Sequence, residues 1–208
     1  MRHVYACACL IAAFAALPAR AATPVLADHL SGSDVTVLLD FKGPYSGQAR
    51  REMEREATAI LRSSGVRLDW RLVGEASGKS FHDLVVMTFK GVCEYEPEPP
   101  RYDELGPYAM TRTTDGQIQP FGEVDCNHVV SSASGAMTGQ DFERADLLVG
   151  RALGRVVAHE LVHMLTKSAE HGKEGVEKPA LSGRQLIAAF LPLSALDIDR
   201  VRLVRPAH

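Results

Sequence analysis

The sequence predicts a single α+β domain, and three observations favour this class. Runs rich in Val, Leu and Ile alternate with an amphipathic helical pattern along the first half of the chain. A long helical pattern dominates the second half. No internal repeat and no Gly-, Ser- or Pro-rich linker divides the chain, whose 208 residues, 46% of them hydrophobic, are enough for one full core.

The first half of the chain predicts three strands and one helix. Residues 34–41 (DVTVLLDF) form a β-branched and leucine-rich run between turn residues, which indicates a strand. Residues 46–62 carry apolar side chains at helical spacing among Arg and Glu, and a Ser-Gly pair follows them. Residues 66–73 alternate between apolar and polar side chains, as in a strand with one solvated face. Residues 83–90 (DLVVMTFK) predict a central strand.

A β-hairpin is expected in the middle of the chain, over residues 106–125. Its turn is Asp115-Gly116, because Asp-Gly favours the tight turn of a two-residue hairpin loop. The preceding acidic and proline-rich residues 94–100 predict a loop, and the small residues 131–139 predict a flexible connection.

A largely buried helix is expected from Gln140 to about Lys167, because apolar residues recur there without a proline or a turn signal. This helix contains the sequence HELVH at residues 159–163, which has the form HExxH. A shorter helix is expected at residues 182–190, and a tail follows it.

The HExxH motif has the spacing of a zinc site. His159 and His163 lie one helical turn apart and are offset by only about 40° around the axis, so both imidazoles can reach one ion. Glu160 lies beside them and suits the role of the base that deprotonates a zinc-bound water. The alternative, a helix with surface histidines, requires three polar residues to interrupt a strongly apolar helix.

A catalytic zinc ion usually has three protein ligands and one open position. His171 is the leading candidate for the third ligand, provided that the helix ends near residues 166–168 and the chain folds back. A continued helix would carry His171 about 12 Å along the axis. Ser168, Gly172 and Gly175 favour such a reversal. The alternative ligands are Glu170, Glu174 and Glu177, and more remotely His128.

The amino terminus predicts a secretory signal peptide over residues 1–21. A polar start precedes an apolar run of about fourteen residues, shorter than the ~20 that span a bilayer, and a small-x-small cleavage pattern follows. We therefore expect the mature chain, residues 22–208, to be periplasmic or extracellular, with no stable membrane association. The alternative is a retained membrane anchor.

Two cysteines, Cys93 and Cys126, remain after the signal peptide is removed. An even pair in an exported chain predicts one disulfide. Closing a loop of this length stabilises a fold by roughly 3–4 kcal/mol. The alternative is two free buried thiols.

The order of the elements, together with the motif, resembles the zincin metallopeptidases and is metzincin-like. That family has a mixed, twisted sheet with an antiparallel edge strand, packed on the helix that carries HExxH, and a third ligand after a helix-ending turn. The metzincin motif is HExxHxxGxxH, whereas this chain has HELVHMLTKSAEH, two residues longer and with Thr166 in place of the glycine. No methionine follows Met164, so the methionine turn of that family has no counterpart.

Residues 150–186 also resemble a group of exported bacterial proteins of unassigned activity. They share the HExxH motif, the later histidine and a following Gly-Val pair, with residues 120–126 (PFGEVDC) upstream. This second resemblance implies no particular substrate.

The zincin resemblance implies an exported zinc peptidase over residues 22–208, with Zn²⁺ as cofactor and a peptide or protein as substrate. The expected edge strand, residues 106–113 or 118–124, would pair with the substrate. Tyr102 and Tyr108 are expected to be ordinary aromatics, with oxyanion donation as the alternative. The formal charge of −3 provides no basic excess, so nucleic acid is not an expected partner. The alternative function is a non-catalytic zinc-binding domain with a binding or scaffold role.

Overall fold

The computed structural model describes residues 35–97 and 106–204. The predicted signal peptide, the predicted start at Ala22 and Tyr102 lie outside these residues. The strands are β1 (Val35–Phe41), β2 (Leu68–Leu72), β3 (Leu84–Lys90), β4 (Ala109–Thr114) and β5 (Gln117–Asp125). The helices are α1 (Gly47–Arg62), α2 (Cys126–Ala136), α3 (Ala145–Thr166), α4 (Gly183–Ile187) and α5 (Ala195–Val204), and short 3₁₀ turns include η2 (Gly139–Arg144) and η3 (Gly175–Glu177).

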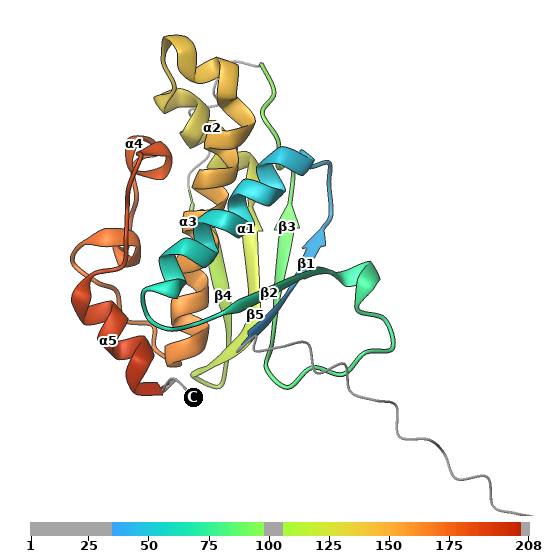
Figure 1. The fold of residues 1–208 in the computed structure, drawn as a ribbon, viewed down its shortest axis with the longest axis vertical. Helices are drawn as coiled ribbons and strands as arrows, with labels where there is room; N and C mark the ends of the chain where they lie inside the picture. Colours follow the sequence, from blue (N-terminus) through green and yellow to red (C-terminus); the bar gives the residue numbers. More distant parts are fainter. Residues whose placement is uncertain (1–34, 98–105, 205–208) are drawn as a thin grey trace, which may run out of the picture.

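The five strands form one mixed sheet in the order β2-β1-β3-β5-β4 (Figure 1). β1 pairs in parallel with β2 and β3, and β3 pairs in parallel with β5. β4 is antiparallel to β5 and lies at the edge. Asp115 and Gly116 connect them with φ angles of 50° and 73°, the left-handed conformation that a type I′ hairpin turn requires. The α+β class and the antiparallel edge strand are therefore confirmed.

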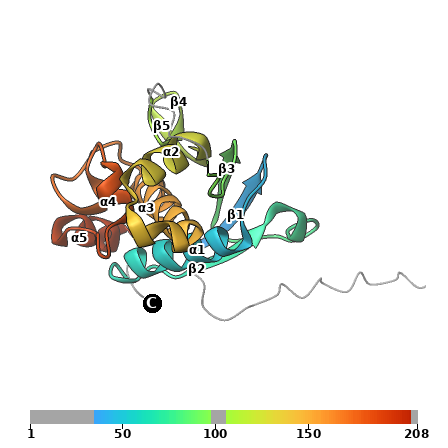
Figure 2. The ribbon, with the colours of Figure 1, turned by 90° about the horizontal axis from the view of Figure 1, so that it is seen from above.

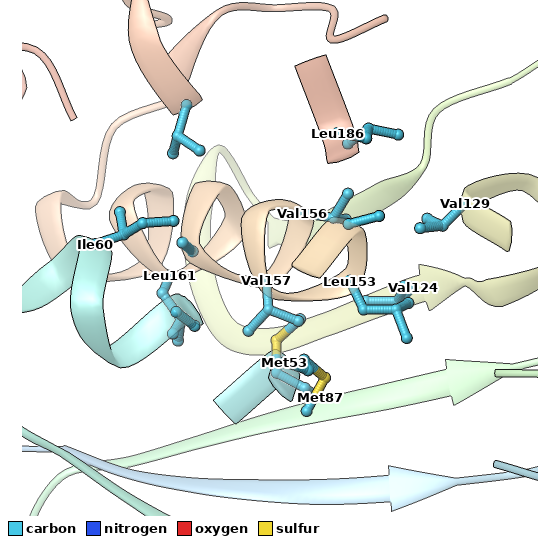
Figure 3. Packing of buried hydrophobic residues seen from close by; sticks show 14 of the residues in the cluster. Met53, Ile60, Met87, Val124, Val129, Leu153, Val156, Val157, Leu161 and Leu186 are labelled. Carbon is cyan, nitrogen blue, oxygen red and sulfur yellow. The ribbon is translucent and has the colours of Figure 1, made fainter. Parts of the chain in front are cut away.

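Helices α1 and α3 pack on the same face of the sheet (Figure 2). Met53 of α1, Met87 of β3 and Val157 of α3 are fully buried and meet between the two layers (Figure 3). The two helices approach closely because α3 has glycines at the crossing. A Cβ atom at Gly150 would lie 2.4 Å from the carbonyl oxygen of Ala49, so only glycine fits there.

The disulfide between Cys93 and Cys126 is confirmed. It joins the loop after β3 to the first residue of α2, a helix that includes residues 131–136 of the expected flexible connection. Asp125 caps this helix, because its side chain accepts a hydrogen bond of 3.1 Å from the amide of His128. The prediction of a flexible connection is therefore wrong over residues 131–136. These small residues are helical because the amino terminus of the helix is capped by Asp125 and cross-linked by the disulfide.

The expected tail is also wrong over residues 195–204, which form α5. The Ser194 hydroxyl accepts from the amide of Asp197 at 3.1 Å and so caps the first turn. The long helix was expected from Gln140, and its α-helical part begins at Ala145 after the turn η2. No helix in the two described ranges is long and apolar enough to span a membrane.

Candidate metal centre

The chain reverses direction at the end of α3, as the sequence predicts. The helix ends at Thr166, and Lys167 adopts the left-handed conformation with φ 53° and ψ 31°. Glycine or asparagine usually occupies such a position, so a lysine here is unusual. The carbonyl oxygen of Ser168 then lies 2.7 Å from Nδ1 of His163. This reversal returns the following residues to the face of α3 that carries the HExxH histidines.

The reversal brings His171 to His159 and His163. The ring centroid of His171 lies 5.1 Å from that of His159 and 4.8 Å from that of His163. One nitrogen from each of the three rings lies within 4.8 Å of the others, close enough for the three to hold one metal ion. The structure therefore brings together the three histidines named from the sequence.

The other candidate ligands lie elsewhere. Glu170 and Glu174 are exposed, and Glu170 forms an ion pair of 3.3 Å with Arg200. His128 stacks on Tyr108, with ring centroids 4.4 Å apart. Glu177 is buried, with its Oε1 3.6 Å from Nδ1 of His159. Among the described residues, only the three histidines form a group close enough to share an ion.

Backbone carbonyls determine which nitrogens of the two helical histidines carry protons. Nδ1 of His159 lies 3.0 Å from the carbonyl oxygen of Val176, and Nδ1 of His163 contacts that of Ser168. A carbonyl oxygen only accepts, so in the neutral rings each Nδ1 is the donor and each Nε2 is an unprotonated acceptor. The two Nε2 atoms nevertheless face each other at 3.0 Å. Two lone pairs at this distance repel, and a shared metal cation relieves that repulsion.

The surroundings of these rings disfavour their protonation. Burial, with smaller contributions from His163 and His171, lowers the pKa of His159 to about 4. Burial and the neighbouring His163 also lower the pKa of His171 from its usual value. His159 is thus neutral near pH 7, which is the form that binds a metal, and the lowered pKa of His171 favours the same form.

Glu160 lies beside the histidines without being one of their group. Its carboxylate is buried, and its Oε2 accepts a hydrogen bond of 2.6 Å from the hydroxyl of Thr111 on β4. Burial raises the pKa of Glu160, while this hydrogen bond opposes the rise.

A cavity of about 400 Å³ opens in front of these side chains. β4 and the residues just before it form one wall, and residues 178–181 form the opposite wall. Tyr108 lines the cavity and stacks on His128, which leaves both the ordinary aromatic and the oxyanion donor as predictions. His159, Glu160 and His163 all line the cavity, so they are accessible to a molecule that enters it.

A stripe of four side chains on one face of α3 contacts the chain that returns along this helix. The sequence indicated the two histidines of this stripe but not its two arginines. Arg151, Arg155, His159 and His163 follow one another at four-residue spacing, which places them on one face of the helix. Each contacts backbone carbonyls of residues 168–188, which run back along α3 (Figure 1). These contacts are Arg151 with Ile187 and Ala188, Arg155 with Gln185, Leu186 and Ala188, His159 with Val176, and His163 with Ser168.

Arg151 and Arg155 continue the four-residue spacing of His159 and His163, and this spacing could have indicated the shared helix face. The structure brings three imidazoles and a buried carboxylate of residues 159–171 to one cavity, which is also lined by residues 106–118 and 178–181. No protein-family model and no curated protein matches the sequence.

Proposed function

We propose that the protein is an exported zinc-dependent peptidase with a zincin-like domain. The observation that carries the proposal is the position of Glu160, which lines the same cavity as the three histidines but is not grouped with them as a ligand. A merely structural metal site has no use for a buried carboxylate in an open cavity, because such a site is closed by four ligands.

The donor set fits zinc. Three imidazoles with one position left for solvent or substrate are typical of catalytic zinc, and His159, His163 and His171 would hold the ion. When bound, zinc supplies Lewis acidity, which polarises a carbonyl oxygen and makes water a better nucleophile near neutral pH.

Glu160 would act as the general base and then as the general acid. Thr111 holds Oε2 of the carboxylate, so the other oxygen is available to take a proton from water. Its raised pKa makes the carboxylate a stronger base than an exposed glutamate. The same oxygen would then deliver the proton to the leaving nitrogen of the cleaved peptide bond.

The edge strand supports a peptide as the substrate class. Within residues 35–97 and 106–204, β4 has a sheet neighbour only on the β5 side, so its outer edge can pair with an extended chain. Residues 109–111 and 113 of this strand line the cavity. A peptide paired with β4 would therefore pass in front of Glu160.

The test is digestion of a peptide library by wild type, Glu160→Gln and His163→Ala, with zinc content measured for each. Glu160→Gln should retain zinc and cleave about 10²–10⁴-fold more slowly, the usual contribution of a general acid–base group. His163→Ala should lose zinc and activity together, because it removes a ligand. Glu174→Gln is the matched control: it changes an exposed glutamate near the site and should leave both quantities unchanged.

Three results would contradict the proposal. A wild-type protein that binds zinc and cleaves nothing indicates the non-catalytic alternative. Equal cleavage by Glu160→Gln and wild type excludes Glu160 as the base. Loss of zinc from Glu160→Gln indicates that Glu160 is a zinc ligand and not the base.

Export is part of the same proposal. The disulfide between Cys93 and Cys126 is typical of proteins in an oxidising compartment. Intact-mass spectrometry of the exported protein should find a chain that begins at Ala22, and a retained Met1 would contradict export through a cleaved signal peptide.

A further inference from the structure

Glu177 is a fully buried carboxyl group without a hydrogen bond. Its exposed fraction is 0%, and neither of its oxygens has a hydrogen-bond partner among the described residues. The nearest cationic or donor group is Nδ1 of His159, which lies 3.6 Å from Oε1. Buried polar groups in native proteins are nearly always paired, so an unpaired carboxyl at this position calls for an explanation.

The turn η3 that carries Glu177 also organises two of the three histidines. The carbonyl oxygen of Val176 faces Nδ1 of His159, and the carbonyl oxygen of Glu177 accepts a hydrogen bond of 2.8 Å from the amide of Gly172, the residue after His171. Gly175 begins the turn with φ 68°, and a Cβ atom there would lie 2.3 Å from the carbonyl oxygen of Pro192. The position of the Glu177 side chain is therefore fixed by the same backbone that positions the ligands.

A neighbouring buried acid has hydrogen-bond and ion-pair partners, whereas Glu177 has no hydrogen bond among the described residues. Asp197 is also fully buried, but it accepts a hydrogen bond of 2.6 Å from the Ser194 hydroxyl and forms an ion pair of 3.3 Å with Arg200. Within the described residues, no lysine or arginine forms an ion pair with Glu177, although Arg200 lies close enough to act on it electrostatically.

Glu177 lies on the side of the His159 ring that faces away from the nitrogen free to bind an ion. The carboxyl group lies on the Nδ1 side of the ring, whereas Nε2 faces His163. Metal-binding histidines commonly direct their second nitrogen at a carboxylate or a carbonyl, which fixes the ring and strengthens the metal bond. Here both acceptors are present on one turn, at Val176 and Glu177.

We propose that Glu177 is a positioning residue for metal binding: from its buried place behind the ring of His159, its carboxylate supplies negative charge beside a divalent cation held at the three histidines. This inference rests on the metal centre of the proposed function and not on peptide cleavage. The cation provides a positive charge for Glu177, which forms no ion pair with a lysine or arginine of the described residues.

The test compares wild type with Glu177→Gln, using the dissociation constant for zinc, from competition with a chelator, and the thermal midpoint of the metal-free protein. Glu177→Gln keeps the shape of the side chain and removes its charge. Its dissociation constant should rise about 10–100-fold, the usual cost of losing such a partner. The thermal midpoint of metal-free Glu177→Gln should not fall below that of metal-free wild type, because an amide costs less to bury than a carboxyl group that has no partner. The control Glu174→Gln, an exposed glutamate three residues earlier, should change neither value.

A second variant separates charge from shape. Glu177→Asp keeps the charge with a shorter reach, and it should bind zinc more tightly than Glu177→Gln. A dissociation constant for Glu177→Gln within about threefold of wild type would overturn the proposal, and so would a metal-free form that is unfolded or less stable, which marks a structural role. Wild-type protein that binds zinc and cleaves no peptide contradicts the peptidase proposal alone.

Discussion

Replacing Arg155 with methionine should destabilise the protein severely. Arg155 lies on α3 with an exposed fraction of 0%. Its guanidinium donates to Glu56 on α1 at 2.9 Å and to the carbonyl oxygens of Leu186 and Ala188 at 3.2 and 2.7 Å, and it also contacts that of Gln185. One side chain thus joins α1, α3 and the chain around α4.

The expected magnitude follows from the groups that the substitution leaves behind. Methionine replaces the apolar stem, so the loss is mainly electrostatic. Glu56 becomes a buried carboxylate without its arginine, and breaking such a pair typically costs about 3–5 kcal/mol. Each carbonyl that water does not reach adds about 1–3 kcal/mol. We expect the free energy of unfolding to fall by at least ~4 kcal/mol, a large share of the 5–15 kcal/mol of an ordinary domain.

Urea unfolding of wild type, Arg155→Met and the double variant Arg155→Met/Glu56→Met measures this loss. The double variant should recover part of the stability, because it no longer buries a carboxylate whose remaining partner is the largely exposed Arg55, at 3.5 Å. Arg50→Met is the control, since the pair of Arg50 with Glu54 is partly solvent-exposed and should contribute at most about 1 kcal/mol. A loss below ~1 kcal/mol for Arg155→Met, or a double variant less stable than the single one, would refute this reasoning.

Two further predictions concern the disulfide and the base. Removing the bond with Cys93→Ser/Cys126→Ser should lower the free energy of unfolding by roughly 3–4 kcal/mol in urea, and a change below ~1 kcal/mol would contradict the loop-closure argument. Thr111→Val removes the hydrogen bond that lowers the pKa of Glu160, so this pKa rises and the acid limb of the kcat/KM profile moves to higher pH. Thr113→Val, which alters the same strand without this bond, should leave the limb in place, and an unmoved limb in Thr111→Val would count against the assignment.

The metal centre was largely readable from the sequence because most of its information is local. The four-residue spacing of His159 and His163 fixes their shared helix face in any α-helix. His171 required a reversal of the chain, which Ser168 and the nearby glycines indicated. The structure produces that reversal at Lys167, with a left-handed lysine that no sequence rule singles out.

The roles that were missed depend on contacts between distant segments. Glu177 was considered only as a substitute ligand, and its place behind His159 follows from the return path of the chain. The helix α2 carries too few apolar residues for a periodic signal, and its stability comes from the Asp125 cap and the disulfide. For α5 a signal was present, because Ser194 and Asp197 have the spacing of a helix cap.

The stripe on α3 has a consequence for how the protein opens. Residues 168–188 contain only η3 and the five-residue α4, so side chains of α3 satisfy much of their backbone. Such a segment exchanges its amide hydrogens through local unfolding at a lower free energy than the packed helices. His159 and His163 belong both to the stripe and to the metal centre, and His171 lies on the segment itself. An ion bound to all three therefore cross-links the segment to α3, and metal occupancy is coupled to amide protection along the whole returning chain.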